Sequence, residues 1–285
     1  MRIDLHAHSS ASDGTETPAE VMAQAKAAGL DVVALTDHDS TAGWDEAATA
    51  AASLDLGLVR GTEVSARSHG ITVHLLSYLH DPSDGPLAEM LSQVRNARWE
   101  RAQAMVMRLA ADFPIRWADV AARASDGRPV GRPHIADELV AQGVVANRAQ
   151  AFDRLLHPSG PYYVRYGAIE AEAAVEMVRQ AGGVPVFAHP GATGRQRIVS
   201  SSVIERMADA GLAGLEVRHR DNPPEQRRRL RDLAQRLGLF ETGSSDYHGA
   251  GKPNRLGENL TSAETLAEII RQGHLPLAGG GQWAR

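Results

Sequence analysis

The chain has 285 residues, no cysteine and a formal net charge of −5. The absence of cysteine excludes disulfides and thiolate metal sites, so a metal would need histidine, carboxylate and water ligands. The mild negative charge gives no overall attraction for nucleic acid or anionic membranes, so phosphate affinity must come from a local site. No apolar run reaches the roughly 18 residues of a membrane span, and no N-terminal signal pattern is visible. We therefore expect a cytoplasmic protein with no membrane partner and no stable nucleic-acid partner.

Short apolar runs alternate with amphipathic stretches along most of the chain. The runs that predict strands are residues 3–5, 32–35, 58–61, 72–76, 184–188, 214–217 and 239–242. The stretches that predict helices are the one after Pro18 and residues 43–53, 169–180, 202–210, 225–237 and 263–271. Gly29, Gly182, Gly211 and Gly238 stand where helix C-caps are expected. This alternation predicts an α/β fold with parallel strands covered by helices.

The alternation stops between residues 81 and 166. Helices without intervening strands are predicted there, at residues 87–111, 117–124, 134–142 and 148–156. Because such a run does not fit a βα repeat, we expect two parts. Residues 1–80 and 167–285 would form a (βα) barrel domain, and residues 81–166 a helical insertion or cap domain folded over its mouth. The alternative is that the helical stretch only extends the α/β core.

Histidines and carboxylates gather around the ends of the predicted strands. In parallel α/β folds, functional groups collect at the C-terminal ends of the strands. Six of the chain's 12 histidines stand at such places or within a strand, all outside the helical stretch. The histidines and carboxylates in these positions are His6, His8, Asp37, His38, Glu63, His74, His189, Asp246 and His248. Placement by chance would have scattered them.

The spacing of these residues suits metal binding. His6 and His8 are two residues apart, so on extended backbone both rings point to one side and can bind one ion. Asp246 and His248 repeat that spacing. Asp13, in the loop after His8, can fold back over the site.

Each of these features has an ordinary explanation when taken alone. Asp13 precedes Gly14 and can simply form a turn. Asp37 can cap the helix that begins near Gly43, and Glu63 can cap a helix or pair with an arginine. Residues of these types at almost every strand end favour a metal site. By contrast, His69, His80, His157 and His274 have no motif around them and are expected at the surface or in loops.

Five ordered segments resemble the motifs of the PHP (polymerase and histidinol phosphatase) family. They are His6-Ala7-His8, Thr36-Asp37-His38-Asp39, Gly61-Thr62-Glu63, Ala188-His189-Pro190 and Ser245-Asp246-Tyr247-His248. The resemblance extends from Asp4 to about Leu260, and it implies a distorted seven-stranded (βα) TIM-like barrel. The segment Gly131-Arg132-Pro133-His134 narrows it to the bacterial branch that acts on 3′,5′-bisphosphonucleosides, 5′-phosphorylated nucleotides and short RNAs.

The resemblance also implies a trinuclear metal centre. The first ion would be held by His6, His8, Glu63 and Asp246. Glu63 would bridge to a second ion, held also by His74 and His189. The third ion would be held by Asp13, His38 and His248, and Asp37 would orient a ligand. The ligand types suit Mn²⁺, Fe²⁺ or Zn²⁺, and we expect Mn²⁺ with zinc or iron as alternatives.

Clustered metal ions can provide a nucleophile and neutralise phosphoryl charge. We therefore expect hydrolysis of a phosphate monoester by in-line attack of a metal-bound hydroxide, since nothing in the sequence resembles an activated serine or cysteine. The residues expected to carry the chemistry are Asp13, Asp37, His38 and His248. Which group protonates the leaving oxygen stays open.

Substrate contacts are predicted in four places. Arg132 and His134 begin a helix whose free N–H groups favour an anion, so they can hold a second phosphate; the alternative for Arg132 is a solvated surface charge. The other candidates are Tyr163, Arg165, Arg195, Arg197, Arg218 and His219. Tyr163 can equally pack the insertion onto the barrel.

Several functions remain in play. The leading hypothesis is a phosphatase for small nucleotides such as 3′,5′-bisphosphonucleosides or 5′-phosphorylated nucleotides. The alternatives are a 5′→3′ exoribonuclease on short 5′-phosphorylated RNA and a histidinol phosphatase. An amidohydrolase is disfavoured because Lys26 and Lys252, the only lysines, lie on no predicted strand. A non-catalytic metal-binding module is disfavoured because the ligand set is complete.

Overall fold

The computed structural model describes residues 1–123, 130–165, 167–194 and 197–283. The chain forms two compact units. Residues Met1–Leu91 and Ile169–Arg285 make up the first unit, and Ser92–Ala168 make up the second. None of the described helices is long and apolar enough to cross a membrane.

The first unit is built on one curved sheet. Its main strands are β1 (Ile3–Ala7), β2 (Val32–Leu35), β3 (Gly57–Ser68), β4 (Ile71–Tyr78), β6 (Val184–Phe187), β7 (Gly214–Arg218) and β8 (Phe240–Gly243). They are hydrogen-bonded in the order β1-β2-β3-β4-β6-β7-β8. A parallel bridge between Ala7 and Tyr247 links the first strand to the segment after the last one. The sheet is therefore nearly closed, which confirms the distorted seven-stranded barrel.

The prediction that the strands are all parallel is wrong for β4. This strand is antiparallel to both of its neighbours, β3 and β6. The cause is the two-residue turn between β3 and β4, where His69 has φ 49° and Gly70 has φ 76°. Two successive residues with positive φ match the right-handed twist of a tight hairpin, so the chain reverses at once. As a result β3 runs on to Ser68, and Glu63 lies inside that strand rather than after it.

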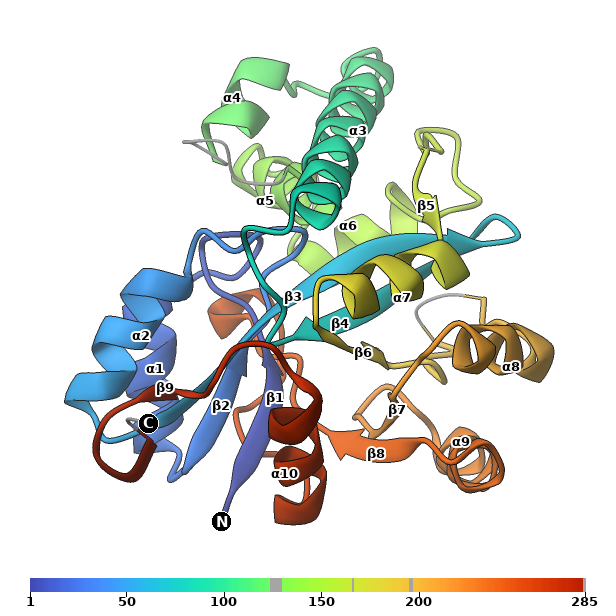
Figure 1. Ribbon diagram of the computed structural model, residues 1–285. Helices are drawn as coiled ribbons and strands as arrows, with labels where there is room; N and C mark the ends of the chain where they lie inside the picture. Colours follow the sequence, from blue (N-terminus) through green and yellow to red (C-terminus); the bar gives the residue numbers. More distant parts are fainter. Residues whose placement is uncertain (124–129, 166, 195–196, 284–285) are drawn as a thin grey trace. The chain divides into compact units, whose positions relative to one another are not determined.

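The helices of the first unit are close to those predicted. They are α1 (Pro18–Ala27), α2 (Trp44–Ser53), α7 (Ala171–Gln180), α8 (Ser201–Asp209), α9 (Pro224–Leu237) and α10 (Ala263–Gln272). Thr17 and Glu20 form a capping box at the start of α1, which fixes where that helix begins. Gly29, Gly182, Gly211 and Gly238 have positive φ after their helices, as the C-cap prediction requires. Figure 1 shows α1 and α2 side by side next to β1 and β2.

The apolar faces of these helices pack against the strands. One cluster includes Ile3, Val32, Val59, Leu76 and Val186, and all five side chains are fully buried. The short elements β5 (Ile169–Glu170), β9 (Ala278–Gly279), η1 (Gly249–Gly251) and η2 (Gly281–Trp283) are too short to show a periodic pattern and were not predicted.

His80 lies in the loop that follows β4, one of the two expected positions, but it is not at the surface. Its side chain is only 1% exposed, and its ring lies 4.9 Å from that of Trp44. Ser77 hydrogen-bonds its Nδ1 at 2.8 Å, so one polar atom of the ring is satisfied inside the core. A single polar residue after an apolar strand gave no sequence signal of this burial.

The described part of the second unit is helical. Its helices are the C-terminal part of α3 (Gly85–Leu109), α4 (Trp117–Ala122), α5 (Arg132–Ala141) and α6 (Arg148–Arg154). The two units meet in sequence within α3, between Leu91 and Ser92. The second unit has a core of its own that includes Met105, Leu109, Ile135 and Leu139. The role of residues 81–166 as a cap domain stays a prediction.

Candidate metal centre

Four buried side chains of the first unit bring one atom each to a common point. His6 Nε2 and His8 Nε2 lie 3.0 Å apart. Glu63 Oε2 lies 3.3 Å from the first nitrogen and 3.0 Å from the second. Asp246 Oδ1 lies 3.5 Å from each. Ligands about 2.1 Å from one ion lie roughly 3.0–3.5 Å from their neighbours in octahedral or tetrahedral geometry, so this group is shaped to hold a cation.

The orientation of His6 is fixed by a residue that the sequence analysis missed. His6 Nδ1 lies 2.9 Å from Oε1 of Glu216 on β7. Because a carboxylate only accepts, Nδ1 of His6 carries a proton, and Nε2 is the ring nitrogen that faces the other predicted ligands. Glu216 also accepts the backbone N–H of His189 at 2.7 Å and the hydroxyl of Ser244. The sequence signal that could have identified Glu216 is a glutamate between two apolar residues in a predicted strand. The structure shows that its side chain is fully buried.

The other oxygen of Glu63 serves a second group. Glu63 Oε1 lies 2.8 Å from His74 Nδ1 and 3.1 Å from His189 Nε2. Antiparallel β4 is what allows this, because it carries His74 to the level of Ser65 on β3. His38 Nδ1 also approaches Glu63, at 3.2 Å from Oε2. Glu63 therefore lies between two sets of histidines, as a bridging ligand would.

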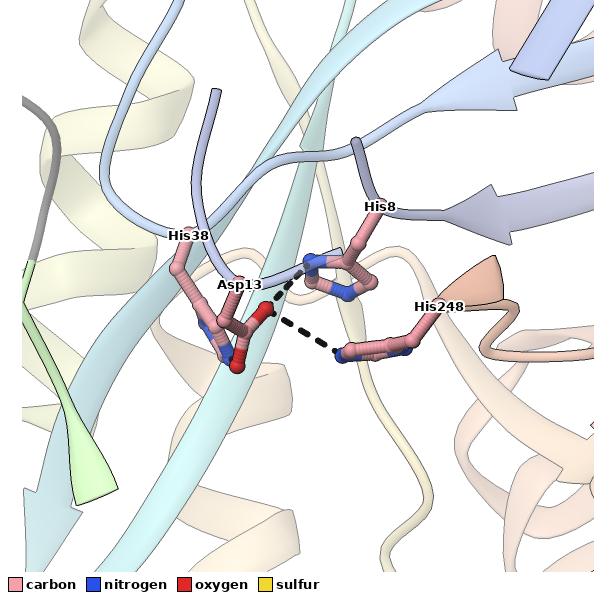
Figure 2. A group of neighbouring side chains, drawn as sticks. All are labelled: His8, Asp13, His38 and His248. Atoms are coloured by element: carbon pink, nitrogen blue, oxygen red, sulfur yellow. Dashed lines mark ion pairs between the residues drawn. The ribbon is translucent and has the colours of Figure 1, made fainter. Parts of the chain in front are cut away.

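A third group surrounds Asp13. Figure 2 shows His8, His38 and His248 around its carboxylate. Asp13 Oδ1 lies 3.2 Å from His248 Nε2 and 3.6 Å from His8 Nδ1, and Oδ2 lies 3.7 Å from His38 Nε2. His248 Nδ1 lies 2.8 Å from the backbone carbonyl of Asp246, two residues earlier. A carbonyl only accepts, so the proton of the His248 ring is on Nδ1 and Nε2 is available to a metal. The structure thus brings together all nine predicted ligands.

The chemistry of the donors fits divalent cations. His74 Nδ1 and His248 Nε2 are buried without a hydrogen-bond partner, although a carboxylate oxygen lies within about 3 Å of each. Nitrogen and oxygen atoms that are close but not aligned as a hydrogen bond are typical of ligands that share one ion. Together with the metal-dependent relative described below, this buried cluster supports the use of divalent metal.

The ionisable side chains of the candidate metal centre shift one another's pKa values. Burial would raise the pKa values of Glu63, Asp13 and Asp246, but the surrounding histidines, with Lys252 at Asp246, hold all three well below their ordinary values. Burial alone would lower the pKa of His6, but Glu216, Glu63 and Asp246 raise it well above its ordinary value. The carboxylates therefore stay ionised and attract positive charge.

Asp37 lies behind the ligands rather than among them. Its Oδ1 accepts the backbone N–H of Ser9 at 2.8 Å and the hydroxyl of Ser12 at 2.6 Å, and its Oδ2 accepts the hydroxyl of Ser9 at 2.7 Å. These bonds hold the loop that connects His8 to Asp13.

The predicted substrate residues of the first unit fall in different places. His219 is fully buried beside Asp246, with 3.6 Å between Nε2 and Oδ2. Arg218 contacts Glu241 and the carbonyl of Leu260 and is not in a ligand group. Arg197 is exposed, and Arg195 lies outside the described residues. Lys252, which the sequence analysis set aside, lies 2.9 Å from Asp246 Oδ2.

The second unit contains the remaining predicted residues. Arg132 donates to the carbonyl of Leu156 at 3.2 Å and lies over the ring of Tyr163, 5.7 Å from its centroid. His134 Nδ1 accepts the N–H of Gly131, which caps its own helix. Arg165 is exposed.

An arginine cluster surrounds Arg132. Arg98 and Arg101, which the sequence analysis missed, line one small cavity with it. Arg98 is only 8% exposed. Arg101 also lies over Tyr163, at 4.8 Å from the ring centroid. These residues concentrate positive charge within the second unit.

Comparison with known proteins places this site in a family. The PHP domain model matches residues 4–124. A 3′,5′-nucleoside bisphosphate phosphatase from Chromobacterium violaceum is 36% identical over 94% of this chain and 94% of its own length. A 5′-3′ exoribonuclease from Haemophilus influenzae is 32% identical over 94% of this chain and 97% of its own length. A crystal structure from Bifidobacterium adolescentis, of a protein assigned as a metal-dependent phosphoesterase, is 46% identical with a TM-score of 0.93, covering 95% of this chain and 96% of that one. The predicted resemblance and the predicted class of enzyme, a hydrolase, are confirmed, and the chain belongs to the PHP domain family.

Proposed function

We propose that the chain hydrolyses phosphate monoesters of nucleotides, with 3′,5′-bisphosphonucleosides and 5′-phosphorylated nucleotides as its substrates. The observation that carries the proposal is the spacing of His6, His8, Glu63 and Asp246, whose nearest atoms lie 3.0–3.5 Å apart. Such a buried set of nitrogen and oxygen donors has little use other than holding cations, because leaving it without them would be costly.

We assign the nine residues as the ligands of three divalent ions. The three carboxylates have separate roles: Glu63 bridges two histidine sets, Asp13 lies among His8, His38 and His248, and Asp246 completes the first group. Histidine with carboxylate and no thiolate favours Mn²⁺, with Zn²⁺ or iron as alternatives.

The ions activate water and neutralise charge on the phosphoryl oxygens when they are bound. The chain's own contribution is to hold the ligands still. Glu216 fixes the tautomer of His6, and Asp37 fixes the loop of Asp13. The described first unit also shields the centre, since every predicted ligand except His74 is buried.

Two relatives support the choice of substrate. One is a 3′,5′-nucleoside bisphosphate phosphatase and the other a 5′-3′ exoribonuclease, and both match almost the whole chain. The exoribonuclease activity is therefore the second candidate. We further propose that the cluster of Arg98, Arg101 and Arg132 binds an anionic group of the substrate, because guanidinium groups suit phosphate oxygens.

The test is phosphate release in the presence of Mn²⁺. The panel contains 3′-phosphoadenosine 5′-phosphate, AMP, histidinol phosphate and a 5′-phosphorylated trinucleotide. The proposal predicts turnover of the bisphosphonucleoside by the wild type and no turnover by Asp246→Ala. Glu205→Ala is the control and should keep the activity, because Glu205 pairs with Arg236 at the surface. Shortening of the trinucleotide to mononucleotides would favour the exoribonuclease. A folded, metal-loaded protein that hydrolyses none of them would refute both.

The arginine cluster has its own comparison. We expect Arg132→Ala to raise KM for the bisphosphonucleoside more than for AMP. Arg116→Ala is the matched control in the same unit, because Arg116 is exposed and pairs with Asp119, three positions away. Equal effects of Arg132→Ala on both substrates would contradict the assignment.

A further inference from the structure

The two oxygens of Asp246 face different partners. Oδ1 lies 3.5 Å from His6 Nε2 and 3.5 Å from His8 Nε2, in the proposed metal group. Oδ2 lies 2.9 Å from the ammonium of Lys252. Asp246 is 1% exposed, whereas the Lys252 side chain is 24% exposed. A buried carboxylate is thus divided between a cation site and a lysine.

His219 lies on the Oδ2 side of Asp246. Its Nε2 lies 3.6 Å from Asp246 Oδ2, and its Nδ1 accepts the backbone N–H of Asp221 at 3.1 Å. A ring nitrogen that accepts a hydrogen bond carries no proton, so the neutral ring carries its proton on Nε2. A protonated nitrogen cannot bind a metal. The set of His219, Asp221 and Asp246 is close enough for an ion, but this tautomer turns an N–H of His219 toward Asp246 rather than a lone pair. The separation of 3.6 Å is too long for a hydrogen bond.

The loop that carries Lys252 is fastened on both sides. Lys252 directly follows η1, where Ala250 donates its N–H to Thr15 Oγ1 at 2.8 Å. After it, the side chain of Asn254 donates to the carbonyl of Ser245 at 2.6 Å. Both anchor points belong to loops that also carry predicted ligands, so the ammonium is held in place by the same framework.

We propose that Lys252 is a positioning residue that occupies Oδ2 of Asp246 and restricts this carboxylate to one oxygen in metal binding. The inference rests on the proposed metal centre. A carboxylate can bind an ion through one oxygen or two. Withholding the second oxygen keeps a coordination position open for water or a substrate oxygen. The positive charge of Lys252 also repels the metal ion. The lysine therefore lowers metal affinity while it keeps a coordination position open.

A positioning role and a merely structural role for Lys252 predict opposite changes in metal affinity when Lys252 is replaced. Mn²⁺ binding to the metal-free protein is measured from the electron paramagnetic resonance signal of the free aqua ion. We expect Lys252→Met to bind Mn²⁺ roughly tenfold more tightly, because a nearby like charge is removed, and to have a lower kcat. Lys252→Arg should restore the wild-type affinity. Lys26→Met is the control, because Lys26 bonds the carbonyl of Asp55 at an exposed position. A folded Lys252→Met protein with unchanged or weaker Mn²⁺ binding would overturn the proposal.

A second measurement uses the wild-type protein. Lys26 and Lys252 are the only lysines, so ε-¹³C-labelled lysine gives two side-chain signals. Bound Mn²⁺ should broaden the signal of Lys252 and spare that of Lys26. Two equally sharp signals in the Mn²⁺-loaded protein would place Lys252 away from the ions and overturn the inference alone. A wild-type protein that binds no Mn²⁺ and hydrolyses no phosphoester would overturn the proposed function, and this inference with it.

Discussion

Replacement of His80 by asparagine should make the protein less sensitive to acid. Burial lowers the pKa of His80 from its ordinary value of 6.5 to about 4, and the hydrogen bond with Ser77 only partly opposes this. Between these two pH values the unfolded chain binds a proton that the folded chain does not bind. The free energy of unfolding of the wild type must therefore fall as the pH falls through this window.

The size of the effect follows from the difference between the two pKa values. A difference of about 2.5 corresponds to about 3 kcal/mol when the whole window is crossed. Between pH 7 and pH 5 the loss attributable to His80 is about 2 kcal/mol. His80→Asn should lower stability at pH 7 because it shortens a buried side chain, and it should then lose about 2 kcal/mol less than the wild type on moving to pH 5.

The assay is urea unfolding at both pH values with a chelator present, so that metal binding does not vary with pH. Trp44→Phe is the matched control, because Trp44 lies against the ring of His80 and donates to the carbonyl of Gly61. It should reduce stability at both pH values but keep the wild-type pH dependence. If His80→Asn and the wild type lose the same stability between pH 7 and pH 5, the argument from burial fails.

Three further outcomes are expected. Glu216→Gln should weaken Mn²⁺ binding by roughly 10–100-fold in calorimetry, because His6 loses the carboxylate that fixes its tautomer; unchanged affinity would contradict that role. Removal of divalent ions by a chelator should lower Tm, since ions that bind only the folded state stabilise it and the like charges of Glu63 and Asp246 are otherwise close; an equal Tm with and without Mn²⁺ would argue against the centre. Gly70→Ala should cost about 1–2 kcal/mol in urea unfolding, because Gly70 has φ 76° in the β3–β4 hairpin, whereas a neutral result would show that the turn relaxes freely.

The barrel was predictable because its signals are local. Strand β2 matches residues 32–35 as predicted, and α1 begins at Pro18 after its capping threonine. The reversed direction of β4 also has a local cause, the turn at His69-Gly70. It was not predicted, because the alternation of strands and helices in the rest of the chain favoured an all-parallel sheet. His74 nevertheless lies beside Glu63, because the hairpin pairs the middle of β4 with Ser65 of β3.

The residues that sequence reasoning missed have roles set by contacts that no local pattern predicts. Glu216 contacts His6 across 210 positions, and no spacing rule links the two. Lys252 contacts Asp246 only six positions away, but the loop between them is irregular and has no period from which to predict direction. Arg98 and Arg101 belong to no motif, yet Arg98 is almost buried. Pairing in three dimensions decides these roles.

Four buried acidic residues of the first unit that are not predicted ligands have a similar role. Asp37 accepts the N–H of Ser9, next to His8; Asp4 accepts the N–H of Ser245, next to Asp246. Asp39 accepts the N–H and hydroxyl of Ser65, which lies opposite His74, and Glu216 accepts the N–H of His189 itself. Each of these buried carboxylates thus fastens the backbone at or beside one ligand. These hydrogen bonds fix the backbone at or beside the ligands, so the ligands are pre-positioned before any ion arrives. In the Asp37-His38-Asp39 segment the histidine lies near Glu63 of the centre, whereas Asp37 fixes the loop after His8 and Asp39 fixes Ser65 within β3.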